Sequence, residues 1–128
     1  MIDKNAFRAV FSDFDAEIIH EIIDIYVREH PLKFDQMLTS LEESDLRTLR
    51  NVAHGLKGVL SQFFAPEAQQ QAKELEYFVR DLLSHVESGS GNQIEDAKKA
   101  QIMEMIHALK GASLHVIDDL LEIKAEFK

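Results

Sequence analysis

The sequence predicts an all-helical protein, an antiparallel up-and-down four-helix bundle with a short N-terminal helix. Apolar residues recur every three or four positions over long stretches, as the buried face of an amphipathic helix requires. Two prolines and five glycines interrupt the 128 residues, and no stretch shows the alternation typical of a half-buried strand. One segment, "ESGSGNQ" at 87–93, has the composition of a flexible loop. A single domain over residues 1–128 is therefore expected.

Local start and stop signals set the expected helices. Ser12, Asp13 or Asp15 can cap the helix that follows them, because their side-chain oxygens accept hydrogen bonds from free backbone N–H groups. Pro31 either lies within that helix or kinks it, and Pro66 suits the first turn of a new helix. The predicted helices cover residues 4–11, 16–44, 46–64, 66–86 and 95–127.

Three of these helices carry apolar stripes that predict the core. The stripe of the second helix is Ile18, Ile22, Ile25 and Tyr26. The stripe of the third is Leu49, Val52, Ala53, Leu56, Leu60 and Phe63. The stripe of the last is Ile102, Ile106, Leu109, Val116, Leu120, Ile123 and Phe127, with Ser113 at one polar position. Stripes this narrow pack at shallow angles, as in up-and-down bundles.

Composition narrows the classes of function. The formal net charge is -9, which disfavours a nucleic acid as partner. The chain has no cysteine, which excludes a disulfide framework and a cysteine-ligated zinc site. No apolar run is long enough to cross a membrane, and the first residues do not resemble a secretion signal. We expect a monomeric cytoplasmic protein with neither a membrane nor a nucleic acid as partner.

The stretch "VAHGLKGVLSQFF" has a helical pattern but contains two glycines, and each costs a helix roughly 1 kcal/mol relative to alanine. His54 lies about 140° from the centre of the apolar stripe, so it should face solvent. Gly55, Gly58 and Gln62 are on the same side of the helix. Lys57 is at its flank. The glycines therefore leave bare backbone around an exposed imidazole, where a large molecule could approach.

This arrangement suits phosphoryl transfer. A neutral imidazole is a good nucleophile near pH 7, and the Lys57 ammonium offers positive charge to phosphoryl oxygens. Most surface histidines have no specific role, but solvent exposure alone does not explain the paired glycines. The sequence has no glycine-rich nucleotide loop, so neither ATP binding nor kinase activity is expected.

The pentad His-x-Leu-Lys-Gly, preceded by alanine, resembles the hallmark of histidine-containing phosphotransfer (HPt) domains of two-component phosphorelays. Here the motif is "AHGLKG" at residues 53–58. Leu75-Glu76, twenty-one residues after the histidine, resembles the Leu-Glu or Leu-Gln pair on the family's next helix. The resemblance covers residues 1–86, whereas the last helix matches by periodicity alone.

The resemblance implies a role for each matching residue. His54 would accept the phosphoryl group through Nε2, and Lys57 would stabilise its oxygens. Glu76 would accept a hydrogen bond from the other imidazole nitrogen, and Gly58 would let a receiver domain approach. Arg80, one turn beyond Glu76, would lie near the phosphoryl group.

The implied partners are response-regulator receiver domains and a hybrid sensor histidine kinase. A receiver would dock on the face around His54, which includes Gly55 and Gln62, with apolar contacts from Phe7 and Phe11. No cofactor or metal is implied for this chain, because the Mg²⁺ that assists transfer would belong to the receiver.

Two features do not fit the resemblance. Phe64 occupies a position where the family often has glycine, which leaves the end of the third helix uncertain. A second pentad, "HALKG" at 107–111, places His107 about 155° from the centre of its apolar stripe. No further helix follows to supply a Leu-Glu pair. His54 is therefore predicted to be the sole acceptor, and His107 is either a coincidence or a second, degenerate site.

Two other functions stay open. Glu17 with His20, and Glu104 with His107, have the spacing of a di-metal carboxylate bundle, an oxidase or a metal store. Both histidines lie about 150° from their apolar stripes, however, and should point outward. The other alternative is a helical interaction module without phosphoryl chemistry, against which the placement of Glu76 argues. The remaining histidines are expected to be surface or boundary residues: His30, His85 and His115.

Overall fold

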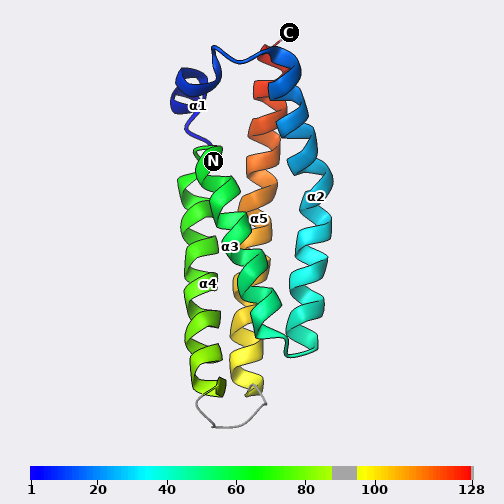
Figure 1. The fold of residues 1–128 in the computed structure, drawn as a ribbon, viewed down its shortest axis with the longest axis vertical. Coiled ribbons are helices and arrows are strands. Elements are labelled where there is room, and N and C mark those ends of the chain that lie inside the picture. The colour runs from blue at the N-terminus through cyan, green and yellow to red at the C-terminus, as the bar shows by residue number, and fades with distance from the viewer. Residues whose placement is uncertain (88–94, 128) are drawn as a thin grey trace.

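The computed structural model describes residues 1–87 and 95–127, and every regular element in this part is an α-helix (Figure 1). The helices are α1 (Lys4–Phe11), α2 (Ala16–Glu42), α3 (Leu46–Gln62), α4 (Pro66–Glu87) and α5 (Asp96–Glu126). The five predicted helices are confirmed, with small shifts at their ends. The predicted loop lies outside the described residues except for Glu87, the last residue of α4. Within the described ranges, no helix is both long and apolar enough to span a membrane.

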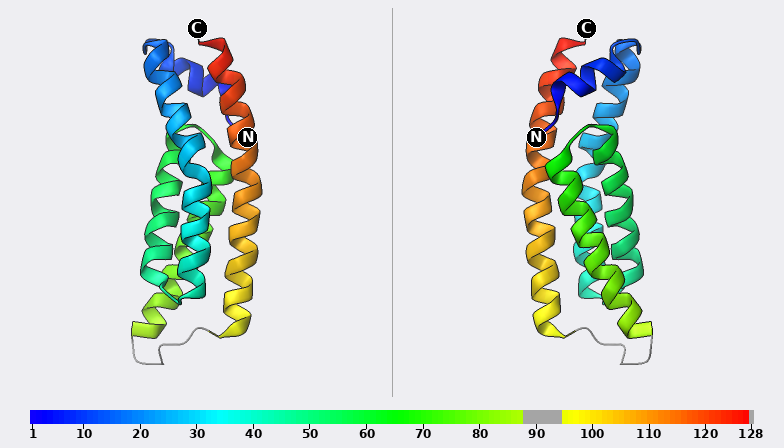
Figure 2. Two further views of the ribbon diagram at one scale, coloured as in Figure 1. Left: turned by 90° about the vertical axis from the view of Figure 1, so that its right-hand side faces the viewer. Right: turned by 90° about the vertical axis from the view of Figure 1, so that its left-hand side faces the viewer.

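The four long helices lie side by side, and α1 lies across one end of them (Figure 2). α3 packs against α2 and α4, and α5 packs against the same two helices. α2 and α5 contain 27 and 31 residues, whereas α3 and α4 contain 17 and 22. The longer pair therefore projects beyond the turn between α3 and α4, and α1 occupies the space above that turn (Figure 1).

The predicted core stripe of α2 is wrong by about one residue. Ile18 and Ile25 are 44% and 36% exposed, and Ile22 is half-buried, although Tyr26 is buried as predicted. Consecutive isoleucine pairs give α2 two adjacent apolar stripes, and the helical period alone does not distinguish them. The residues that α2 buries are Ile19, Ile23, Tyr26, His30, Phe34, Met37, Ser40 and Leu41.

The predicted stripes of α3 and α5 are confirmed, with Val52 and Phe127 only partly buried. The polar position on α5 has a structural reason, because the buried Ser113 hydroxyl lies 2.5 Å from the Tyr26 hydroxyl of α2. Pro31 lies inside the continuous α2 on its exposed side, so the segments before and after it belong to one helix.

The expectation that His30 is a surface or boundary residue is wrong. It is 4% exposed, and its ring contacts those of Tyr26 and Phe34. Burial, together with the positive charge of Lys110, lowers the pKa of this imidazole. His30 follows Tyr26, which the predicted stripe already contained, by one helical turn, so the two side chains share the buried face of α2.

The ends of α2 and α3 show how the chain turns. Asp15, one of three predicted caps, is the N-cap residue of α2, although its side chain makes no capping hydrogen bond. After α3, Phe64 adopts a left-handed φ of 58°, a conformation that glycine takes without strain. The N–H of Ala65 donates to the carbonyl of Leu60 over 3.0 Å, which closes the helix end. Phenylalanine at this position therefore leaves the turn to α4 intact.

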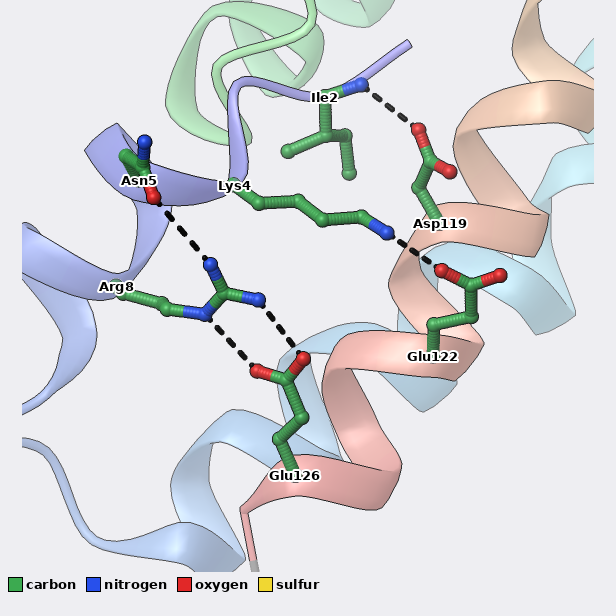
Figure 3. Close-up of polar contacts among 7 residues, drawn as sticks. All are labelled: Ile2, Lys4, Asn5, Arg8, Asp119, Glu122 and Glu126. Atoms are coloured by element: carbon green, nitrogen blue, oxygen red, sulfur yellow. Dashed lines mark hydrogen bonds and ion pairs between the residues drawn. The ribbon is translucent and has the colours of Figure 1, made fainter.

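Polar contacts attach the N-terminal segment to the last turns of α5 (Figure 3). The Ile2 N–H donates to Asp119 over 2.9 Å. Lys4 pairs with Glu122, and Arg8 forms a two-pronged pair with Glu126 at 3.0 and 2.8 Å. The Phe7 ring is buried and contacts the rings of Phe11, Phe63 and Phe127. α1 is thus held by both ion pairs and an aromatic cluster.

Candidate functional site

α3 presents His54 to solvent because its opposite side is buried. Leu49, Ala53 and Leu56 on that buried side are at most 1% exposed, so they fix the helix in the bundle. The His54 side chain is 66% exposed, in agreement with its predicted angle. Another molecule can therefore reach the ring while the helix keeps its backbone in place.

Glu76 of α4 orients the imidazole. Its side chain is 9% exposed, and Oε2 accepts a hydrogen bond from His54 Nδ1 over 2.8 Å. An ionised carboxylate only accepts hydrogen bonds, so Nδ1 must carry the proton. Nε2 is then the nitrogen with an available lone pair when the ring is neutral.

The same carboxylate also contacts Lys57, whose Nζ lies 2.7 Å from Glu76 Oε1. Burial raises the pKa of the Glu76 carboxyl, but the interactions with Lys57 and His54 outweigh it and leave that pKa below its ordinary value. Glu76 therefore stays ionised at neutral pH and holds His54 and Lys57 side by side.

Gly55 and Gly58 leave open space around the ring. A Cβ atom built at either position meets no atom of the described structure within 4 Å. Packing within the chain therefore does not require glycine at these positions. Glycine is unfavourable in a helix interior, so the two positions leave room for a molecule that is not part of this chain.

Arg80 lies one turn beyond Glu76, but its described contact is with Tyr77 rather than with His54. The guanidinium carbon is 4.4 Å from the centre of the Tyr77 ring. The ammonium groups of Lys57 and Lys73 lie 5.7 and 5.6 Å from the same centre. Sequence reasoning missed Tyr77 and Lys73, although their spacing from Arg80 places all three on neighbouring turns of α4.

An apolar groove extends from α3 towards α1. One cavity, of about 190 Å³, lies between α2 and α3, and a second, of about 400 Å³, lies at the end next to α1. Ile22, Gln62 and Phe63 line both cavities, so the two form one continuous depression. Gln62 and Phe11, two predicted binding residues, line this groove. Ile22 and Ile25, which sequence analysis assigned to the core stripe of α2, also line it.

The second pentad lacks the setting of the first. His107 is exposed, and a Cβ at Gly111 would meet open space, as at Gly58. Among the described residues, however, no carboxylate forms a hydrogen bond or ion pair with His107. The two pentads therefore differ in the group that orients the ring.

The di-metal alternative finds no support in the geometry. His20, predicted to point outward, is half-buried, and its Nε2 lies 3.0 Å from the backbone carbonyl of Lys124. That ring nitrogen also contacts the carbonyl of Phe127. Within residues 1–87 and 95–127, no three His, Cys, Asp or Glu side chains are grouped closely enough to hold a metal ion.

The model of the Hpt domain family matches residues 21–97, more than half of the 128-residue chain. Comparisons with curated proteins and with solved structures found no match. The matched range contains α3 and α4, and with them the pair formed by His54 and Glu76. The chain therefore belongs to the Hpt domain family, whose members act in phosphotransfer in two-component systems.

Proposed function

We propose that this protein carries phosphoryl groups between the aspartates of receiver domains, with His54 as the acceptor. The observation that supports this most strongly is the 2.8 Å hydrogen bond from His54 Nδ1 to the buried carboxylate of Glu76. One ring nitrogen is held and the other is free to act as a nucleophile at an exposed position. The whole chain is proposed to be one domain, an antiparallel up-and-down bundle that acts as a phosphocarrier without kinase activity.

In the proposed step, the lone pair of His54 Nε2 attacks the phosphorus of an aspartyl phosphate in line. The N–P bond forms as the P–O bond to aspartate breaks, and aspartate leaves as a carboxylate with the electron pair. The ring, bonded to phosphorus at Nε2 and to hydrogen at Nδ1, becomes positively charged. The ionised Glu76 stabilises that charge. The reverse reaction passes the phosphoryl group to a second receiver.

The receiver supplies what this chain lacks. A receiver domain brings the aspartyl phosphate and its Mg²⁺, and a hybrid sensor histidine kinase supplies the phosphoryl group upstream. The apolar groove beside α3 offers a docking surface, because Ile25, Val10 and Phe14 on its margins are 36–48% exposed. Exposed apolar side chains gathered at one groove are typical of a protein interface.

Labelling with phosphate tests the acceptor. A receiver phosphorylated with acetyl phosphate is mixed with the wild type, His54→Gln or His107→Gln, and acid-labile, base-stable phosphate on this chain is followed. Label should disappear in His54→Gln and persist in His107→Gln. Loss in His107→Gln alone would move the site to α5. No label on any variant, with several receivers tried, would reject phosphotransfer in favour of an interaction module.

Phe11→Ala tests the docking surface separately. Phe11 lines the groove and is partly buried, so its removal should weaken receiver binding and slow transfer. An unchanged transfer rate would show that α1 takes no part in docking. Phe14→Ala, at a position 45% exposed on the same groove, distinguishes loss of contact from disturbance of the aromatic cluster.

A further inference from the structure

Three cations from α3 and α4 lie near one aromatic ring, and one of them also contacts the carboxylate that holds the candidate acceptor. Arg80 lies 4.4 Å from the centre of the Tyr77 ring, and Lys73 and Lys57 lie 5.6 and 5.7 Å from it. The negative face of an aromatic ring attracts each cation. Tyr77 is 38% exposed, so its ring is not part of the buried core, and the cations around it lie at the surface.

The cluster of Lys57, Lys73 and Arg80 around Tyr77 is positively charged, although the protein as a whole is acidic. The chain has a net charge of -9, yet α3 contains three basic residues and no acidic residue. Neither Lys73 nor Arg80 forms an ion pair within the described structure, whereas Lys57 is paired with Glu76. Like charges held this close repel one another, and an anion would relieve that repulsion.

Lys57 links the cluster to the acceptor. It contacts Glu76, which holds His54, and it lies over Tyr77, which holds Arg80. Arg80 follows Glu76 by four positions, so it lies on the same side of α4. Tyr77 therefore restricts where the Arg80 guanidinium can lie relative to the imidazole.

The charges at the acceptor require a further cation. A phosphoryl group on His54 carries nearly two negative charges at neutral pH and would sit close to the Glu76 carboxylate. The positive ring of phospho-His54 balances that carboxylate, which leaves the Lys57 ammonium as one positive charge against nearly two. Arg80 and Lys73 have no acidic partner within the described residues, so they are the further cations available to the phosphoryl oxygens.

We propose that Tyr77 is a positioning residue for phosphoryl transfer: its ring holds the Arg80 guanidinium beside His54, where that guanidinium binds the phosphoryl oxygens. The inference rests on the proposed function. It assigns Arg80 as the group that touches the phosphoryl oxygens and Tyr77 as the residue that acts through Arg80.

The test compares Tyr77→Leu, which removes the aromatic face, with Tyr77→Phe, which keeps it. The main readout is the equilibrium constant between the phosphorylated receiver and phospho-His54. We expect Tyr77→Leu to lower this constant about fivefold and Tyr77→Phe to match the wild type. A control melt should show little change in Tm, because the ring is substantially exposed.

Arg80→Gln provides the matched partner variant. It should lower the same constant, and adding Tyr77→Leu should lower it no further, because both changes remove one interaction. Full additivity would overturn the inference. So would a Tyr77→Leu protein with a wild-type constant, or a Tyr77→Phe protein as impaired as Tyr77→Leu.

Two other outcomes distinguish a docking role for the cluster from a failure of the proposed function. If transfer rates fall but the equilibrium constant does not, the cluster acts by docking the receiver, and its assignment to the phosphoryl group is wrong. If the wild type takes no label at His54, the proposed function fails, and the inference fails with it.

Discussion

His30 shows what a single buried residue contributes to this fold. Its Nε2 is buried and has no hydrogen-bond partner among the described residues, and the ring lies between Tyr26 and Phe34. A buried polar atom left without a partner destabilises a protein by about 1–3 kcal/mol. The residue thus opposes folding even when it is uncharged.

Lower pH should increase the destabilisation caused by the buried His30 ring. Burial, with the charge of Lys110, lowers the pKa of the His30 imidazole below its ordinary value of 6.5. The unfolded chain therefore binds this proton at a higher pH than the folded chain does. The free energy of unfolding must fall as the pH decreases through 6.5.

His30→Leu should therefore raise the free energy of unfolding by about 1 kcal/mol at pH 8 and by more at pH 5.5. Urea denaturation at the two pH values measures this. His115→Gln, at an exposed position on α5, is the control and should keep the wild-type pH dependence. If His30→Leu also keeps the wild-type dependence, His30 is not the titrating group.

Residues on the exposed face of α3 could be predicted from the sequence, and the family resemblance also implied the contact between His54 and Glu76. Other polar contacts between helices could not be predicted. The position of His54 follows from helical geometry alone. The hydrogen bond between Tyr26 and Ser113 joins α2 to α5 across 87 positions, and only the packed bundle brings them together. The cations around Tyr77 likewise depend on how α3 lies against α4.

At the scale of helices, the starts of α3 and α4 were predictable because they depend on nearby residues. Pro66 begins α4, and Asp45 caps α3 by accepting hydrogen bonds from Thr48. The core face of α2 was not predictable, because two adjacent isoleucine stripes satisfy the same period. Which stripe is buried depends on the neighbouring helices, and Ile22 and Ile25 of the other stripe line the groove beside α3.

One substitution on α3 should stabilise the protein and slow phosphoryl transfer. Gly58→Ala should raise the free energy of unfolding by about 0.5–1 kcal/mol, because alanine favours a helix and the new Cβ meets no atom of this chain. The same Cβ projects into the space through which a receiver would approach His54. Transfer from a phosphorylated receiver should slow roughly tenfold, measured beside a thermal melt.

Gly111→Ala is the matched control on α5, since a Cβ there also meets open space. It should stabilise the protein to a similar extent without slowing transfer. If Gly58→Ala raises stability but transfer keeps its wild-type rate, the open surface at Gly58 is not needed by the partner.

At the scale of the whole molecule, the attachment of α1 links stability to docking. α1 consists of eight residues, too few for a stable isolated helix, so its structure depends on contacts with the other helices. These contacts are the aromatic cluster around Phe7 and the ion pairs of Lys4 and Arg8. The two kinds of contact differ in strength, because Phe7 is 1% exposed whereas the Arg8 and Glu126 side chains are 42% and 45% exposed.

Exposed ion pairs contribute little to stability, whereas truncating a buried phenylalanine costs about 3–5 kcal/mol. Phe7→Ala should therefore release α1, seen as faster amide hydrogen exchange over residues 4–11, and should slow transfer because Phe11 leaves the groove. In Arg8→Ala, the amides of α1 should stay protected from hydrogen exchange. They should also stay protected in the wild type at about 1 M salt, where the Debye length is about 3 Å and exposed ion pairs are screened. If salt speeds exchange over residues 4–11 and Phe7→Ala does not, then ion pairs rather than aromatic packing hold α1 in the docking surface.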